Sequence, residues 1–138
     1  MNEAFVTAVL CIDGRYRRCL VEWLSDHYHA DYVDLVTEPG PELVLTDEFS
    51  DAAASVRRRV DVSIRAHDSK AIAIVGHDDC AGNPVDRETH RSQIERRRSL
   101  TRLAPAPSHP RRLRRHSLSN LRRRRRRSKS CAYNQLAV

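Results

Sequence analysis

The sequence predicts an α/β fold: a doubly wound, mainly parallel sheet of three to four strands flanked by helices, followed by a disordered basic tail. Two observations lead to this prediction. Apolar runs of strand length alternate with segments whose apolar residues keep helical spacing, an order typical of parallel sheets with right-handed crossovers. The charges are also segregated, because the last acidic residue is Glu95 and only basic charges follow it.

Three apolar runs are the expected strands, at residues 5–10, 32–36 and 71–75. The first and third are continuous runs of small or β-branched apolar residues, as in strands buried on both faces. A helix is expected after each strand. In sheets of this kind, ligands collect at the carboxyl ends of the strands.

The first expected helix covers about residues 16–30, and its apolar stripe consists of Cys19, Leu20, Trp23, Leu24 and Tyr28. The second begins at a cap formed by Thr46 or Asp47 and ends near Ala66. Its apolar positions are Phe49, Ala52, Ala53, Val56, Val60 and Ile64. The third opens after Gly82-Asn83-Pro84, which places proline in a first turn, and ends near Ile94.

The formal net charge of +7 on 138 residues is the sum of two unlike segments. Residues 1–95 hold all 18 acidic residues and ten basic ones, for a charge of −8, and residues 96–138 carry +15. We therefore expect a folded domain over 1–95 and a tail over 96–138. High like charge and low hydrophobicity predict disorder in that tail.

Three interpretations of the tail stay open. Its arginine run at 122–127 would neutralise phosphates and bind nucleic acid largely without sequence preference. The tail could instead dock onto the acidic domain. Its abrupt onset and its Arg/Ser/Pro/Leu bias are also what a shifted reading frame in GC-rich DNA would produce, so that 96–138 would not be an evolved segment.

The sequence predicts a cytoplasmic protein with no membrane partner. No stretch approaches the roughly 20 apolar residues of a membrane span, and the N-terminus lacks the features of a secretory signal. The four cysteines, at 11, 19, 80 and 131, are too few and too scattered to predict a disulfide framework. In a reducing compartment, such thiols bind metal or stay free.

Two short motifs follow the first and third expected strands. They are Cys11-Ile12-Asp13-Gly14-Arg15 and His77-Asp78-Asp79-Cys80. If these strands are neighbours, their carboxyl ends bring the motifs together. Thiolate and imidazole are zinc ligands, and three protein ligands leave a fourth position for water. We therefore predict a Zn²⁺ centre held by Cys11, His77 and Cys80.

Asp13 and Arg15 are the expected catalytic pair. The carboxylate could accept a hydrogen bond from zinc-bound hydroxide, and pairing with Arg15 would keep it ionised and correctly aimed. Zinc lowers the pKa of its water towards about 7 and so supplies hydroxide at neutral pH. The alternative interpretation is a structural salt bridge at a turn, beside two buried metal-free thiols and a hydrogen-bonded histidine.

Cys-x-Asp-x-Arg at 11–15, followed by His-x-x-Cys at 77–80, resembles the β-class carbonic anhydrases, especially the short forms without an N-terminal helical extension. The resemblance covers roughly residues 4–95. It implies that Cys11, His77 and Cys80 hold zinc and that Asp13 and Arg15 form the catalytic dyad. It also implies reversible hydration of carbon dioxide to bicarbonate by attack of zinc hydroxide, and a homo-oligomer.

The chain departs from the family pattern at several positions. Gly14 replaces the usual serine, Ala81 replaces the usual glycine, and residues 36–40 replace the usual Arg-Asn-Ala-Gly segment. The family's fourth core strand has no visible counterpart in the tail. Two alternatives to the zinc lyase follow: a non-catalytic zinc-binding protein of the same fold, or a basic-tailed nucleic-acid binder.

Other side chains that could ligate a metal are not expected to do so. Asp78 and Asp79 are expected to face solvent or to cap the following turn. Cys19 is expected in the core, and His67 is expected to be half-buried or to have a partner. Three histidines without evident partners are expected at the surface: His27, His29 and His90.

Overall fold

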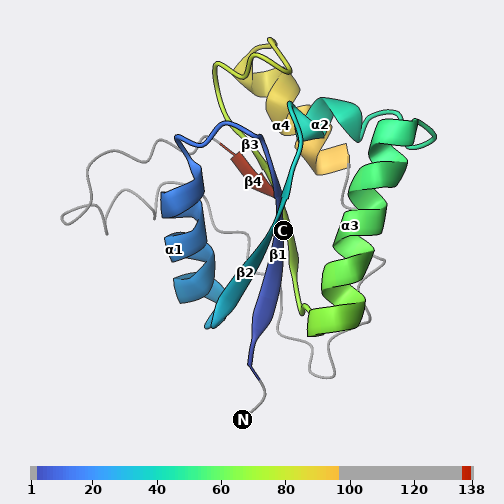
Figure 1. The fold of residues 1–138 in the computed structure, drawn as a ribbon. Coiled ribbons are helices and arrows are strands. Elements are labelled where there is room, and N and C mark those ends of the chain that lie inside the picture. The colour runs from blue at the N-terminus through green and yellow to red at the C-terminus, as the bar shows by residue number, and fades with distance from the viewer. Residues whose placement is uncertain (1–2, 97–134, 138) are drawn as a thin grey trace, which may run out of the picture.

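The computed structural model describes residues 3–96 and 135–137, and it confirms the α/β architecture (Figure 1). The elements are, in chain order, β1 (Phe5–Leu10), α1 (Arg17–Tyr28), β2 (Tyr32–Thr37), α2 (Pro41–Val44), α3 (Asp51–His67), β3 (Ile72–Gly76), α4 (Arg87–Arg96) and β4 (Gln135–Ala137). The strands lie in the order β2-β1-β3-β4. β1 pairs in parallel with both β2 and β3, whereas β4 pairs antiparallel with β3.

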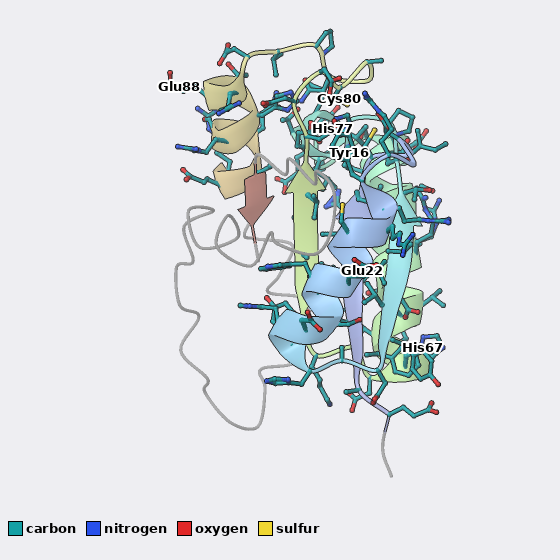
Figure 2. All side chains as sticks on the ribbon, turned by 90° about the vertical axis from the view of Figure 1, so that its left-hand side faces the viewer. Tyr16, Glu22, His67, His77, Cys80 and Glu88 are labelled. Carbon is teal, nitrogen blue, oxygen red and sulfur yellow. The ribbon has the colours of Figure 1, made fainter. Side chains whose placement is uncertain are left out.

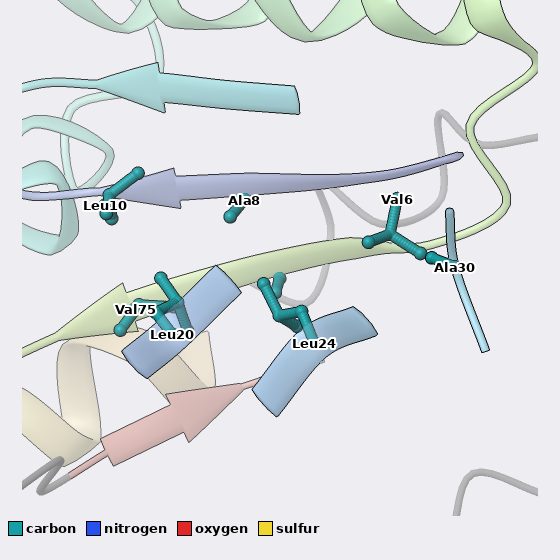
Figure 3. Close-up of a cluster of buried hydrophobic side chains, with 8 residues drawn as sticks. Val6, Ala8, Leu10, Leu20, Leu24, Ala30 and Val75 are labelled. Atoms are coloured by element: carbon teal, nitrogen blue, oxygen red, sulfur yellow. The ribbon is translucent and has the colours of Figure 1, made fainter. Parts of the chain in front are cut away.

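Both faces of β1 and β3 are covered by helices, which explains their continuous apolar sequences. Figure 1 shows α1 and α3 on opposite sides of the sheet. The cluster on the α1 side (Figure 3) consists of Val6, Ala8, Leu10, Leu20, Leu24, Ala30, Ala73 and Val75. The cluster on the α3 side consists of Val9, Val36, Leu45, Ala53, Val56, Val60, Ile72 and Ile74.

The start of α3 differs from the sequence prediction. Its N-cap is Ser50, whose Oγ accepts a hydrogen bond from the backbone N–H of Ala53, so a cap at Thr46 or Asp47 was wrong. The hydroxyl of Thr46 instead donates to a carbonyl of the short helix α2, which the sequence did not predict. Residues 46–50 therefore connect two helices and do not extend one.

Two of the predicted core positions of α3 are exposed. The side chain of Phe49 is 91% exposed because it lies before the helix begins. Ala52 lies in the first turn but faces solvent, while the neighbouring Ala53 is buried. The later start of the helix thus moves the buried stripe to Ala53, Val56 and Val60.

The strand β4 is a second element that the sequence did not predict. Leu136 lies opposite Val75, and Gln135 lies opposite Gly76, at the edge of the sheet beyond β3. Three residues are too short a run to signal a strand by periodicity. The arginine run at 122–127 and Cys131 lie outside the described residues, and the division into domain and tail stays a prediction. None of the helices described here combines the length and apolar character required to cross a membrane.

Candidate metal centre

The carboxyl ends of β1 and β3 lie side by side and bring the two sequence motifs together. Leu10 pairs with Val75 in the parallel ladder, so Cys11 and His77 follow neighbouring strand positions. The candidate ligand atoms of Cys11, His77 and Cys80 all lie within 4.8 Å of one another, and the two sulfurs are 3.7 Å apart. All three residues are buried, and Figure 2 shows His77 and Cys80 at this end of the molecule.

The imidazole of His77 is oriented by contacts at its Nδ1 atom and on the face of its ring. Its Nδ1 lies 2.7 Å from the backbone carbonyl of Asp78, an arrangement in which an Nδ1–H donates and Nε2 keeps its lone pair. The ring of Tyr16 packs against it, with the ring centroids 4.5 Å apart. Nε2 is buried and has no hydrogen-bond partner among the described residues. A metal ion would satisfy this nitrogen, since ligating histidines commonly donate their other N–H to a carbonyl.

The electrostatics of the two thiols differ. Burial raises the pKa of Cys11. Hydrogen bonds from the backbone N–H groups of Gly40 and Asp13, together with the neighbouring His77, lower it by more, so the net shift is downward. Burial and the adjacent Cys11 sulfur raise the pKa of Cys80. Two thiolates 3.7 Å apart repel each other, so a divalent cation would stabilise both at once.

The pKa of His77 is raised. Burial lowers it, but the Cys11 sulfur and the Asp78 carbonyl favour the protonated ring and outweigh that effect. Both effects favour positive charge on the ring next to the Cys11 sulfur, and a bound cation would supply positive charge at the same place. Two sulfurs and one imidazole nitrogen form a soft donor set suited to transition metals, and these residues fit a metal ion.

Asp13 and Arg15 form an ion pair at the edge of this centre. The Nε–H of Arg15 lies 3.0 and 2.9 Å from the two carboxylate oxygens, and the backbone N–H of Arg15 donates to Oδ1 at 3.1 Å. These hydrogen bonds lower the pKa of Asp13 to about 2. The carboxylate is therefore ionised and fixed in direction at neutral pH.

Asp79 joins this pair to the candidate ligand His77. Its carboxylate accepts hydrogen bonds from Arg15 and from the hydroxyl of Tyr16, both at 3.2 Å, and lies 3.5 Å from Nδ1 of His77. Its backbone is left-handed, with φ of 57°. Asp79 is exposed as predicted, but no pattern in the sequence indicates these contacts. Asp78 pairs with Arg87 at 2.7 Å and does not belong to the ligand group.

The predictions for the other histidine and cysteine side chains were partly right and partly wrong. His67 has a partner as predicted, because its Nδ1 lies 2.7 Å from the carboxylate of Asp34. Cys19 is half-buried on α1. His90 was wrongly predicted at the surface: it is 2% exposed and contacts Glu42. His90 and Ile94, one turn apart, both lie on the buried face of α4, which begins at Arg87 and not directly after Pro84 as predicted.

A comparison with protein families agrees with the geometry. The model of the family described as "Putative carbonic anhydrase" matches residues 1–104 of the 138. The chain belongs to this family. The match to the carbonic anhydrase-like family spans β1 to α4 and so includes both motifs. No match was found among curated proteins or among solved structures.

Proposed function

We propose that the protein is a zinc-dependent lyase that catalyses the reversible hydration of carbon dioxide to bicarbonate. The observation that carries the proposal is the buried Cys11-His77-Cys80 cluster at the carboxyl edge of the sheet, in a chain of a carbonic anhydrase-like family. Cys11, His77 and Cys80 would hold the ion, and the two thiolates would cancel its formal charge. When bound, zinc would supply a nucleophile at neutral pH by lowering the pKa of a water molecule.

Asp13 has the properties of an orienting group. Its pKa, lowered to about 2 by the hydrogen bonds from Arg15, favours the role of hydrogen-bond acceptor over that of general base at neutral pH. Asp13 can accept a hydrogen bond from the attacking water and fix the direction of its lone pair towards the carbon. Arg15 holds the carboxylate, and Asp79 and Asp13 together hold Arg15.

The proposed reaction takes place at the solvent-facing edge of the site. In a single chain the side chain of Arg15 is 60% exposed and that of Asp13 is 21% exposed, so the dyad is open to water and carbon dioxide mainly on its Arg15 side. The homo-oligomer implied by the family resemblance remains part of the proposal.

Hydration kinetics of the purified zinc protein test the proposal. Asp13→Asn should lower the rate at least about tenfold with zinc content unchanged, because an amide oxygen is a weaker and less well-held acceptor. Cys80→Ser should lower both zinc content and rate. Asp26→Asn is the matched control, since Asp26 is exposed on α1. Unchanged turnover in Asp13→Asn would reject the dyad, and a zinc-loaded parent without turnover would reject the enzyme.

A second candidate is a non-catalytic zinc-binding protein of the same fold. The segment after β2 favours it, because Glu38 pairs with Arg59 of α3 at 2.7 Å and Arg59 also donates to the carbonyl of Thr37. These contacts attach the segment after β2 to α3, which is a structural role and not a catalytic one. Stoichiometric zinc without hydration would support this candidate. Nucleic-acid binding through the tail would depend on residues outside the described part of the chain.

A further inference from the structure

A buried polar cluster lies next to the metal centre and takes no part in the proposed mechanism. Its members are Glu42 of α2, Asn83 of the loop after Cys80, and His90 and Gln93 of α4. Glu42 and Asn83 are fully buried. Glu42 Oε2, Asn83 Oδ1 and His90 Nε2 have no hydrogen-bond partner within the described structure. Burying these groups is unfavourable, which calls for a compensating role.

The hydrogen bonds of the cluster connect three separate segments. The amide nitrogen of Asn83 donates to Glu42 Oε1 at 3.0 Å and to Gln93 Oε1 at 2.7 Å. The Nδ1 of His90 lies 2.8 Å from the same Glu42 oxygen. Glu42 and Asn83 are 41 residues apart in sequence, so these contacts fix α2 and α4 to the loop that follows Cys80.

The segment before α2 and the loop after Cys80, which these contacts hold, both approach the sulfurs of the candidate ligands. The backbone N–H of Gly40 hydrogen-bonds the sulfur of Cys11, and that of Gly82 hydrogen-bonds the sulfur of Cys80. The two glycines touch: a Cβ on Gly40 would lie 2.7 Å from the carbonyl oxygen of Gly82. The backbone N–H of Asn83 also donates to the carbonyl of Cys80 at 3.1 Å.

The cluster also contacts the segment of the third ligand. A Cβ on Gly76, the residue before His77, would lie 3.4 Å from the carboxyl carbon of Glu42 and 3.0 Å from Ile94 of α4. Gly76 thus leaves room for the Glu42 carboxylate beside β3. The segments of His77 and Cys80 therefore contact the polar cluster directly, and Cys11 is linked to it through Gly40, two residues before Glu42.

We propose that Glu42, Asn83 and His90 are positioning residues of the metal centre, which clamp the two glycine segments so that their N–H groups face the sulfurs of Cys11 and Cys80. This inference rests on the proposed function, because it takes these cysteines as metal ligands. Donors in an outer shell fix ligand orientation, and their loss typically costs 10–100-fold in metal affinity.

The test is the metal affinity of variants in which the hydrogen bond between Asn83 and Glu42 is first broken and then restored with donor and acceptor exchanged. Asn83→Asp places a carboxylate oxygen against Glu42 and should weaken the binding of Zn²⁺ and Co²⁺ about 10–100-fold, measured by competition with a chromophoric chelator. The double variant Glu42→Gln/Asn83→Asp reverses donor and acceptor and should recover part of that loss. Glu88→Gln, an exposed acid-to-amide change on α4, is the matched control and should bind as the parent does.

A further readout separates positioning from general stability. The sulfur-to-cobalt charge-transfer band should shift or weaken in Asn83→Asp at temperatures where circular dichroism shows that the variant is folded. If Asn83→Asp does not fold, Glu42→Gln alone provides the same comparison with a smaller expected loss of severalfold.

The outcomes are distinct. Folded variants that bind Co²⁺ within about twofold of the parent, with an unchanged charge-transfer band, would overturn the clamp while leaving the proposed function intact. A parent protein that binds neither metal would overturn the proposed function itself. Recovery of affinity in the double variant, with Glu88→Gln unchanged, is the result that the clamp predicts.

Discussion

Replacing Gly40 by alanine should destabilise the protein and disturb the metal centre together. Gly40 has φ of 55° and ψ of 58°, a left-handed conformation that costs an L-residue about 1–2 kcal/mol. The added Cβ would also lie 2.7 Å from the carbonyl oxygen of Gly82, and backbone of this kind cannot move as a side-chain end can. Overpacking of this sort adds about 1–3 kcal/mol, so the expected loss is about 2–5 kcal/mol.

Gly14→Ala provides a matched control in the same part of the molecule. A Cβ on Gly14 would meet no atom within 4 Å, and its backbone is not left-handed. We therefore expect its free energy of unfolding to stay within about 0.5 kcal/mol of the parent. The two variants make the same chemical change, and only one of them introduces strain.

Urea unfolding followed by the fluorescence of Trp23, the single tryptophan, measures both variants, because Trp23 packs against the core beneath α1. Metal affinity measured on the same samples shows whether displacing the Gly40 N–H group from the Cys11 sulfur weakens metal binding. A Gly40→Ala protein with the stability and metal affinity of the parent would refute the close contact between the two glycine segments.

Two further predictions concern charge and packing. Because the pKa of Asp13 is about 2, below its ordinary value, its contribution to stability is present above about pH 4 and is lost as the pH falls towards 2. Arg15→Gln should raise the pKa of Asp13 towards about 4 in a carboxyl NMR titration, and an unchanged titration would show that Arg15 is not its cause. Phe49→Ser should alter the free energy of unfolding by at most about 0.5 kcal/mol, whereas Val56→Ala should cost about 1–3 kcal/mol. Equal losses for the two in chemical denaturation would contradict the observed start of α3.

The parts of the fold that the sequence predicted are those with strong local patterns. The continuous apolar runs of β1 and β3 and the helical stripe containing Leu20 and Leu24 are local signals, and the parallel order follows from their alternation. β4 has only three residues, and α2 has four, so neither is long enough to show a period. The start of α3 was misplaced because Thr46 has a cap-forming side chain that serves α2 instead.

The sequence predicted the grouping of the three candidate ligands, but not the residues that surround them. The types and spacing of Cys11, His77 and Cys80 indicated one cluster, and the parallel pairing of β1 and β3 brings them together. Glu42 and His90 are both buried against Asn83, which lies 41 residues from Glu42 and seven residues from His90 in the sequence. No local sequence pattern predicts such contacts. Polar residues of this kind look solvent-exposed in a sequence because their partners come from tertiary structure.

X-ray absorption at the zinc edge of the purified protein, together with its metal content, tests the central claim most directly. We expect one zinc per chain with two sulfur ligands and one imidazole nitrogen among its neighbours, since Cys11, His77 and Cys80 are the grouped donors of the described structure. A protein that takes up no zinc, or zinc whose first coordination shell contains no sulfur, would contradict the account.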